Sequence, residues 1–119
     1  MTTIERAIET YGKDMQLTVA VEEFAELIKE ICKSKRGADN REAIIEEMAD
    51  CYIMLDQLAL IFDIPHRDIN NVMGRKIARL DRRLKKRLAE RGETCVVCGD
   101  IIPEGRQVCP KCEEVTNES

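Results

Sequence analysis

The sequence predicts an all-α protein with a small metal-binding segment at its C-terminal end. Before position 91, apolar residues recur at steps of three and four, the period of an amphipathic helix, and alternating β-branched residues are almost absent. After position 91, glycine and proline become frequent and four cysteines appear in two close pairs. These observations divide the 119 residues into a helical domain, 1–91, and a cysteine-rich segment with a polar tail, 92–119.

Four helices account for the helical domain, and their expected ranges are 3–11, 14–35, 40–62 and 65–90. Gly12 separates the first two, and basic residues followed by Gly37 are typical of the end of the second. Asp39 followed by Glu42 has the spacing of a capping box and predicts the start of the third. Pro65 suits the first turn of the fourth.

The third expected helix is apolar on nearly all sides from Cys51 to Phe62. Such a helix has to be buried on several sides, and a domain of about 90 residues offers only three other helices to cover it. We therefore expect a second subunit to supply the missing cover, in a homodimer or homotetramer. A monomeric bundle with this helix at its centre is the alternative.

Charge is distributed in three blocks, although the whole chain carries only −4. Residues 1–64 have a balance of −7, residues 65–91 a balance of +7 and residues 92–119 a balance of −4. The N-terminal residues lack the basic-then-apolar pattern of a secretory signal, and the longest apolar-rich run, 51–64, is too short and too polar to span a bilayer. We expect a cytoplasmic protein without a membrane partner, in which paired cysteines indicate metal rather than disulfides.

A five-residue acidic pattern occurs twice, 24 residues apart, as Glu22-Glu23-Phe24-Ala25-Glu26 and Glu46-Glu47-Met48-Ala49-Asp50. In a helix, each set of three acids falls within an arc of about 100°. A solvated charged face is the alternative, and it predicts lysine or arginine three or four residues from each acid. Only Glu26 has such a neighbour, Lys29. Clustered carboxylates without local cations indicate a hard divalent ion such as Mg²⁺, and the absence of nearby histidine argues against zinc at this position.

This acidic pattern resembles that of the all-α nucleoside triphosphate pyrophosphohydrolases, a superfamily that includes MazG-like proteins. The similarity lies in Glu22-Glu23-x-x-Glu26, twenty intervening residues and Glu47-x-x-Asp50, and it covers about residues 4–90. The resemblance implies a MazG-like four-helix bundle completed by oligomerisation. It also implies Mg²⁺-dependent hydrolysis of a nucleoside triphosphate to monophosphate and pyrophosphate.

Residue by residue, the resemblance implies Mg²⁺ ligands at Glu23, Glu26, Glu47 and Asp50. Glu22 and Glu46 would assist catalysis by orienting ligands or positioning water. The resemblance also places basic residues of the fourth helix near the triphosphate, where the candidates are Lys76 and Arg79, and a solvated basic helix is the alternative. Further candidates for substrate contacts are Gln16 and Asn71.

The cysteine-rich segment has the pattern Cys95-x-x-Cys98, ten residues, Cys109-x-x-Cys112. Each pair can form a knuckle that directs two sulfurs at one ion, and the segment looks like a small zinc ribbon. A closed set of four thiolates indicates a structural site for Zn²⁺, with iron left open. Nucleic acid is not expected as a partner, because this segment is acidic.

Two other functions remain open at this point. The chain could be a helical module that binds nucleic acid or protein, with a structural zinc ribbon and no catalysis. It could also be a related hydrolase that acts on another pyrophosphate, such as phosphoribosyl-ATP.

Overall fold

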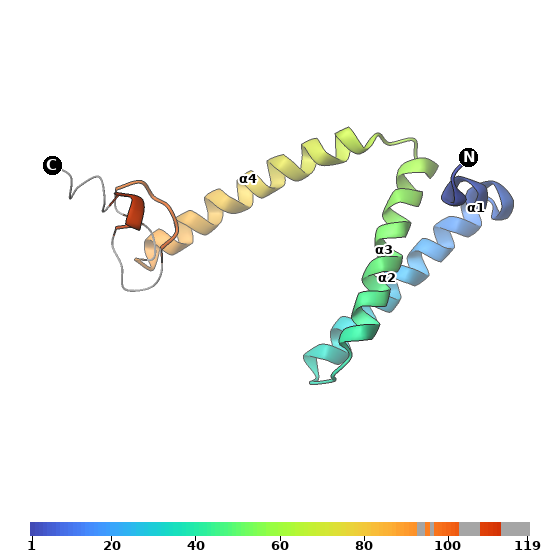
Figure 1. Ribbon diagram of the computed structural model, residues 1–119, viewed down its shortest axis with the longest axis horizontal. Helices are drawn as coiled ribbons and strands as arrows, with labels where there is room; N and C mark the ends of the chain where they lie inside the picture. The colour runs from blue at the N-terminus through green and yellow to red at the C-terminus, as the bar shows by residue number, and fades with distance from the viewer. Residues whose placement is uncertain (93–94, 96, 103–107, 113–119) are drawn as a thin grey trace. The chain divides into compact units, whose positions relative to one another are not determined.

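The computed structural model describes residues 1–92, 95, 97–102 and 108–112. Among these residues the chain is mostly helical, and the elements in order are α1 (Thr3–Tyr11), α2 (Lys13–Lys35), α3 (Arg41–Ile61) and α4 (His66–Glu90), with no strand between them (Figure 1). The predicted all-α class is thereby confirmed for the described part of the chain. None of the helices there is both long and apolar enough to cross a membrane.

The chain forms two compact units, Met1–Ile69 and Asn70–Ser119. The division falls inside α4, whereas the composition of the sequence changes near Gly92. The domain boundary expected at Gly92 was inferred from this change in composition, and it stays a prediction.

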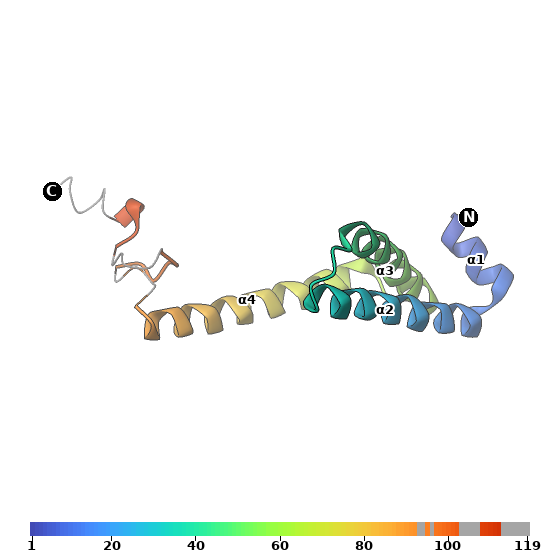
Figure 2. The ribbon, with the colours of Figure 1, turned by 90° about the horizontal axis from the view of Figure 1, so that it is seen from below.

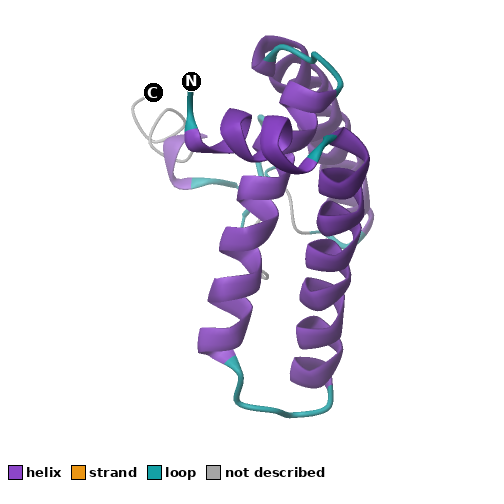
Figure 3. Cartoon of the chain, turned by 90° about the vertical axis from the view of Figure 1, so that its right-hand side faces the viewer, coloured by secondary structure: helices purple, strands orange, loops and turns teal. Residues whose placement is uncertain are grey.

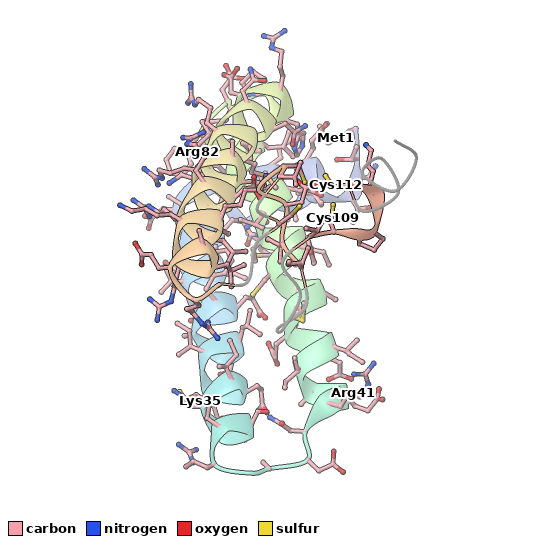
Figure 4. All side chains as sticks on the ribbon, turned by 90° about the vertical axis from the view of Figure 1, so that its left-hand side faces the viewer. Met1, Lys35, Arg41, Arg82, Cys109 and Cys112 are labelled. Atoms are coloured by element: carbon pink, nitrogen blue, oxygen red, sulfur yellow. The ribbon has the colours of Figure 1, made fainter. Side chains whose placement is uncertain are left out.

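In the first unit, α2 and α3 form an antiparallel hairpin, with the connection at one end (Figure 3). At the end of α2, the N–H of Gly37 donates to Ser34 at 2.9 Å and that of Ala38 donates to Lys33 at 3.1 Å. This pair of bonds satisfies the last carbonyls of a helix and requires a left-handed residue, and Gly37 has a φ of 95°. Lys35 and Arg41 lie on either side of the connection (Figure 4).

The predicted capping box at the start of α3 is wrong. The residue that caps α3 is Asn40, and no side chain makes the capping hydrogen bond. The Asn40 amide donates instead to α2, to the carboxylate of Glu30 at 2.7 Å and to the Glu30 carbonyl oxygen at 2.9 Å. A contact between two helices has therefore replaced the local cap.

The end of α3 has the same closing pattern as the end of α2. Ile64 donates to Ala59 at 2.8 Å, and Asp63, with a φ of 53°, occupies the left-handed position. Aspartate tolerates this conformation better than most residues with a side chain. The motif turns the chain toward Pro65 and the start of α4.

Helix α1 lies against the hairpin at the end where α2 begins (Figure 2). Gly12 joins the two helices with a φ of 90°, and its N–H donates to Ile8 at 2.8 Å. The sharp turn between α1 and α2 therefore depends on a residue without a Cβ atom.

The first unit buries few apolar side chains, namely Ala20, Cys51, Met54 and Ala59. Large apolar residues stay exposed on several faces of the hairpin, and those on one side include Ile28, Ile31, Met48, Tyr52 and Leu55. Tyr52 is 67 % exposed. An apolar hollow of about 230 Å³ lies on this side, lined by Leu27, Met48, Cys51, Tyr52 and Leu55. The apolar side chains on the several faces of α3 are thus only partly covered within one chain.

In the second unit, α4 is followed by the cysteine-rich segment. Cys95, Ile102 and Cys109 form a small buried cluster, against which Val108 and Cys112 pack. Lys85 of α4 forms ion pairs with Asp81 at 3.4 Å and with Asp100 at 4.0 Å. The second of these pairs links the helix to the cysteine-rich segment.

Candidate metal centres

Three carboxylates from two helices converge in the first unit. One oxygen each from Glu23, Glu47 and Asp50 lie within 4.8 Å of one another. Glu47 and Asp50 share a face of α3 because they are three residues apart, and the hairpin brings α2 alongside that face. We call these three residues the carboxylate cluster. Its donors are hard oxygens, the ligands that Mg²⁺ and Ca²⁺ prefer.

The side chains of the carboxylate cluster disfavour one another's charge. Burial raises the pKa of Glu23, and the nearby Asp50 raises it further. Burial also raises the pKa of Glu47, followed by the charges of Asp50 and Glu26. Glu47 Oε2 is shielded from water and has no hydrogen-bond partner among the residues that the structure describes. A cation at the cluster would offset the repulsion and satisfy this acceptor.

The other three predicted acids lie outside the cluster. Glu26 forms an ion pair with Lys29 at 3.9 Å, and both side chains are exposed. Glu22 and Glu46 are exposed, each next to a member of the cluster in sequence. The structure therefore brings together three of the six acids. Glu26 lies close enough for its charge to raise the pKa of Glu23 and of Glu47.

Polar contacts join α2 to α3 toward each end of the hairpin, and between them Sγ of Cys51 donates to the carbonyl oxygen of Glu23 at 3.6 Å. At one end, Gln16 Nε2 donates to Gln57 Oε1 at 2.7 Å, and Gln57 Nε2 donates to the carbonyl oxygen of Gln16 at 3.0 Å. At the other end, the carboxylate of Glu30 accepts from Asn40 at 2.7 Å and from Lys33 at 3.3 Å. The bond from Asn40 is the main cause that lowers the pKa of Glu30. These contacts fix the register that places Glu23 opposite Asp50.

Sequence reasoning missed Gln57 and Asn40, although a signal was present. Gln16, Glu23 and Glu30 follow one another at steps of seven, or about two helical turns, so they share one stripe of α2. Asp50 and Gln57 repeat this spacing on α3. Gln16, expected to contact substrate, has its side chain buried in the contact with Gln57, and its role toward substrate stays a prediction.

The predicted phosphate-binding residues of α4 belong to the second unit. Lys76 and Arg79 line a surface groove of about 350 Å³ together with Val72, Arg75 and Arg82. Asn71 is exposed near the start of the same helix. The groove is strongly basic, and the contact of these residues with a triphosphate stays a prediction.

The four predicted thiol ligands come together in the second unit. One sulfur each from Cys95, Cys98, Cys109 and Cys112 lie within 4.8 Å of one another, and Sγ of Cys98 is 3.6 Å from Sγ of Cys109. Cys109 and Cys112 lie close together in Figure 4. The first knuckle closes through hydrogen bonds from Gly99 to Cys95 and from Cys95 to Asp100, both of 2.8 Å. We call this set the thiol cluster.

The thiols have different tendencies to ionise. Hydrogen bonds from the backbone N–H groups of Cys98 and Cys109 lower the pKa of Cys95 to about 6. Hydrogen bonding with the thiols of Cys109 and Cys98 raises the pKa of Cys112 to about 12. The fold thus favours the thiolate of Cys95, whereas the raised pKa values of Cys98 and Cys112 disfavour further negative charge there. A tetrahedral ion that accepts four sulfurs, such as Zn²⁺, fits this donor set.

The fold and its two clusters define an all-α chain with one carboxylate centre and one thiol centre. Comparison with models of protein families, with curated proteins and with solved structures finds no match to the chain.

Proposed function

We propose that the protein is a Mg²⁺-dependent nucleoside triphosphate pyrophosphohydrolase. The observation that carries the proposal is the carboxylate cluster, in which Glu47 Oε2 is shielded from water without a hydrogen-bond partner in the described part of the chain. The resemblance of the acidic pattern to the all-α pyrophosphohydrolases supports the same activity.

Glu23, Glu47 and Asp50 are the residues that would hold Mg²⁺. Glu26 would join them by giving up its exposed ion pair with Lys29, which contributes at most about 1 kcal/mol at a surface. When bound, Mg²⁺ supplies a positive charge for the phosphate oxygens and makes a coordinated water more acidic. Without a cation, an acidic hairpin would repel a triphosphate.

The proposed reaction breaks the bond between the α- and β-phosphoryl groups. The oxygen of a water molecule ends on one phosphorus, and the bridging oxygen leaves with the other product. Glu22 and Glu46 are the candidates to orient this water or to accept its proton, since both are exposed beside the cluster. Lys76 and Arg79 are the candidates to bind phosphate oxygens, and Asn71 and Gln16 to contact the nucleoside.

A second copy of the chain is the proposed partner in a homodimer or homotetramer. At about 100° per residue, the exposed Met48, Tyr52 and Leu55 lie on a different side of α3 from Asp50 of the carboxylate cluster, whereas the exposed Ile53 lies near Asp50. An interface on the apolar side would supply the missing core and leave the carboxylates open to substrate. The thiol cluster is proposed to hold Zn²⁺ as a structural ion.

The proposal predicts that Glu47→Gln abolishes hydrolysis. Pyrophosphate release would be measured with Mg²⁺ and a panel of nucleoside and deoxynucleoside triphosphates. Loss of a direct ligand should lower the rate by more than the ~100-fold that is usual for residues that only orient ligands. In parallel, titration with Mn²⁺, followed by electron paramagnetic resonance, should show weaker binding by the variant.

Glu42→Gln is the matched control, because Glu42 is an exposed glutamate in the first turn of α3, outside the cluster. It should leave both pyrophosphate release and Mn²⁺ binding unchanged. Absence of pyrophosphate release from every nucleotide, or equal release by Glu47→Gln and the wild type, would overturn the proposal.

A further inference from the structure

Helix α4 carries a straight row of exposed cations, Arg75, Arg79, Arg82 and Lys86, which we call the basic row. The spacing of four, three and four residues keeps these side chains within about 60° of one another around the helix and spreads them over about 16 Å. The first three line one groove of about 350 Å³, together with Val72 and Lys76. Arg82 is labelled on α4 in Figure 4.

No member of the basic row forms an ion pair among the residues that the structure describes. The carboxylates of Asp81 and Asp100 both pair with Lys85, which follows Arg82 by three residues and is not a member of the row. The row therefore keeps its full charge toward solvent. Apart from Glu90, four residues after Lys86, no carboxylate lies three or four residues from a member of the row, so an external anion would offset the repulsion between these cations.

The apolar residues of α4 lie on the opposite face from the basic row. Met73, Ile77, Leu80 and Leu84 also follow steps of four, three and four residues, and each is at least 42 % exposed. Packing of this apolar stripe against another protein surface would leave the basic row uncovered. The two faces can therefore serve two different partners.

The chemistry of the basic row favours an anion that repeats along its length. A single triphosphate is shorter than the row, which extends over about 16 Å, whereas a nucleic-acid backbone offers one charge after another along that length. Helix α4 contains no phenylalanine, tyrosine or tryptophan, and single strands are typically held by stacking of their bases on such side chains. The major groove of duplex DNA is wide enough to admit an α-helix. A duplex therefore fits better than a single strand.

We propose that the basic row of α4 binds the phosphate backbone of double-stranded DNA, without reading its sequence. The acidic blocks 1–64 and 92–119 confine this contact to α4, because they repel the same polyanion. The total charge of −4 conceals the site, since the acidic blocks outweigh the helix. This binding uses neither Mg²⁺ nor the carboxylate cluster, and it shares only Arg79 with the residues proposed to bind the triphosphate.

The test is fluorescence anisotropy with the full zinc-loaded chain and a labelled 20-base-pair DNA duplex at several salt concentrations. Four phosphate contacts predict that affinity falls about 100-fold between 50 and 200 mM salt. The variant Arg75→Gln/Arg82→Gln/Lys86→Gln leaves Lys76 and Arg79 intact. It should bind at least ~10-fold more weakly at 50 mM salt and lower the slope of log affinity against log salt by about three.

The matched control is Lys13→Gln/Lys35→Gln/Arg36→Gln, which removes three exposed cations from the first unit. It should change affinity by less than about threefold, although its change in net charge is the same. Circular dichroism checks that both variants stay helical, and glutamine preserves helix propensity at these positions.

Several outcomes would overturn the proposal. One is an affinity for the duplex that does not fall as salt rises. Another is an equal loss of affinity in the two triple variants, and a third is tighter binding of a 20-nucleotide single strand than of the duplex. Competition by a nucleoside triphosphate at equal phosphate concentration, in the absence of divalent ions, would assign the row to small phosphates instead. Tighter binding to vesicles of anionic lipid than to duplex would assign it to a membrane surface.

Discussion

Glu30 and Glu47 lie on neighbouring helices of one hairpin, and their surroundings move their acidity in opposite directions. The hydrogen bond from Asn40 stabilises the charged form of Glu30 and lowers its pKa. Burial, and then the charge of Asp50, destabilise the charged form of Glu47 and raise its pKa. Glu23 behaves like Glu47. Charged glutamates thus stabilise the hairpin at its end and oppose its folding at the carboxylate cluster.

At this scale we predict opposite effects on stability for Glu23→Gln and Glu30→Gln. The raised pKa of Glu23 means that the folded state binds this proton more tightly, so stability is lost as pH rises through the folded pKa. In the absence of divalent ions, Glu23→Gln should therefore raise Tm at pH 7 and change it little near pH 4. The lowered pKa of Glu30 has the opposite effect, because the charged form of Glu30 stabilises the folded state. That stabilisation is present at pH 7 and is lost as pH falls. Glu30→Gln should lower Tm at pH 7.

Thermal unfolding followed by circular dichroism between pH 4 and 7 would measure both effects. Addition of Mg²⁺ should raise the Tm of the wild type more than that of Glu23→Gln, because the wild type keeps the full ligand set. A lower Tm for Glu23→Gln at pH 7 without divalent ions would show that the carboxylates of the cluster do not repel one another.

At the scale of elements, α3 is the helix whose apolar side chains are least covered by the rest of its own chain. It contributes an apolar side with Tyr52 and Leu55 exposed, next to the hollow of about 230 Å³. The opposite side carries Glu47 and Asp50. A helix with these two sides joins the proposed interface to the proposed metal site, so oligomerisation would also steady the geometry of the carboxylates.

We predict that Tyr52→Glu weakens self-association. Burial of one large apolar side chain stabilises by about 1.5 kcal/mol or more, and a symmetric interface loses it twice, which is about 100-fold in the dissociation constant. Light scattering and sedimentation over a range of concentrations would measure the change. Thr18→Glu, which adds the same charge at an exposed position of α2, should leave the association unchanged. A monomeric wild type would contradict the prediction.

At the scale of the whole molecule, the two units rely on different sources of stability. The first has a helical hairpin with polar contacts at both ends and an apolar side left uncovered. Among its described residues, the second has little apolar core beyond Cys95, Ile102 and Cys109, so we expect its cysteine-rich segment to depend on a bound ion. Loss of that ion should therefore affect one unit without unfolding the other.

We predict that removal of the bound metal disorders the cysteine-rich segment and leaves the hairpin folded. Metal analysis of freshly prepared protein should find about one Zn or Fe per chain, since four thiolates close a single tetrahedral site. After treatment with a chelator, or in Cys98→Ser, amide NMR signals of residues 95, 97–102, 108 and 109 should collapse to random-coil positions. Signals of α2 and α3 should stay in place. A metal content far below one per chain would contradict the prediction.

Local patterns were enough to predict the four helices to within a few residues. Gly37 and Gly12 mark ends because only a residue without a Cβ atom adopts their φ angles easily. The prediction of a capping box at Asp39 is wrong because the local pattern takes no account of other helices. The side chain of Asn40 donates a hydrogen bond to Glu30 of α2 instead. Helix boundaries follow from neighbours in the chain, and caps also depend on neighbours in space.

The candidate sites were predictable to different degrees for the same reason. The four cysteines could be grouped from spacing alone, since each pair lies within one short turn. The six acids could be assigned to two helical faces, but only the packing of α2 on α3 selected Glu23, Glu47 and Asp50 as a cluster. The role of Gln57 could not be predicted, because a glutamine in an apolar run gains its hydrogen-bond partner only when the fold places Gln16 opposite it.

By itself, the sequence determined the helical class, the separation of acidic and basic blocks and the grouping of the thiols, because these depend on residues a few positions apart. The tertiary structure decided which carboxylates meet, which glutamates gain or lose acidity and which apolar side chains stay exposed. Those properties depend on the register of α2 against α3. That register is fixed by contacts between Gln16 and Gln57 and between Glu30 and Asn40, which no local pattern encodes.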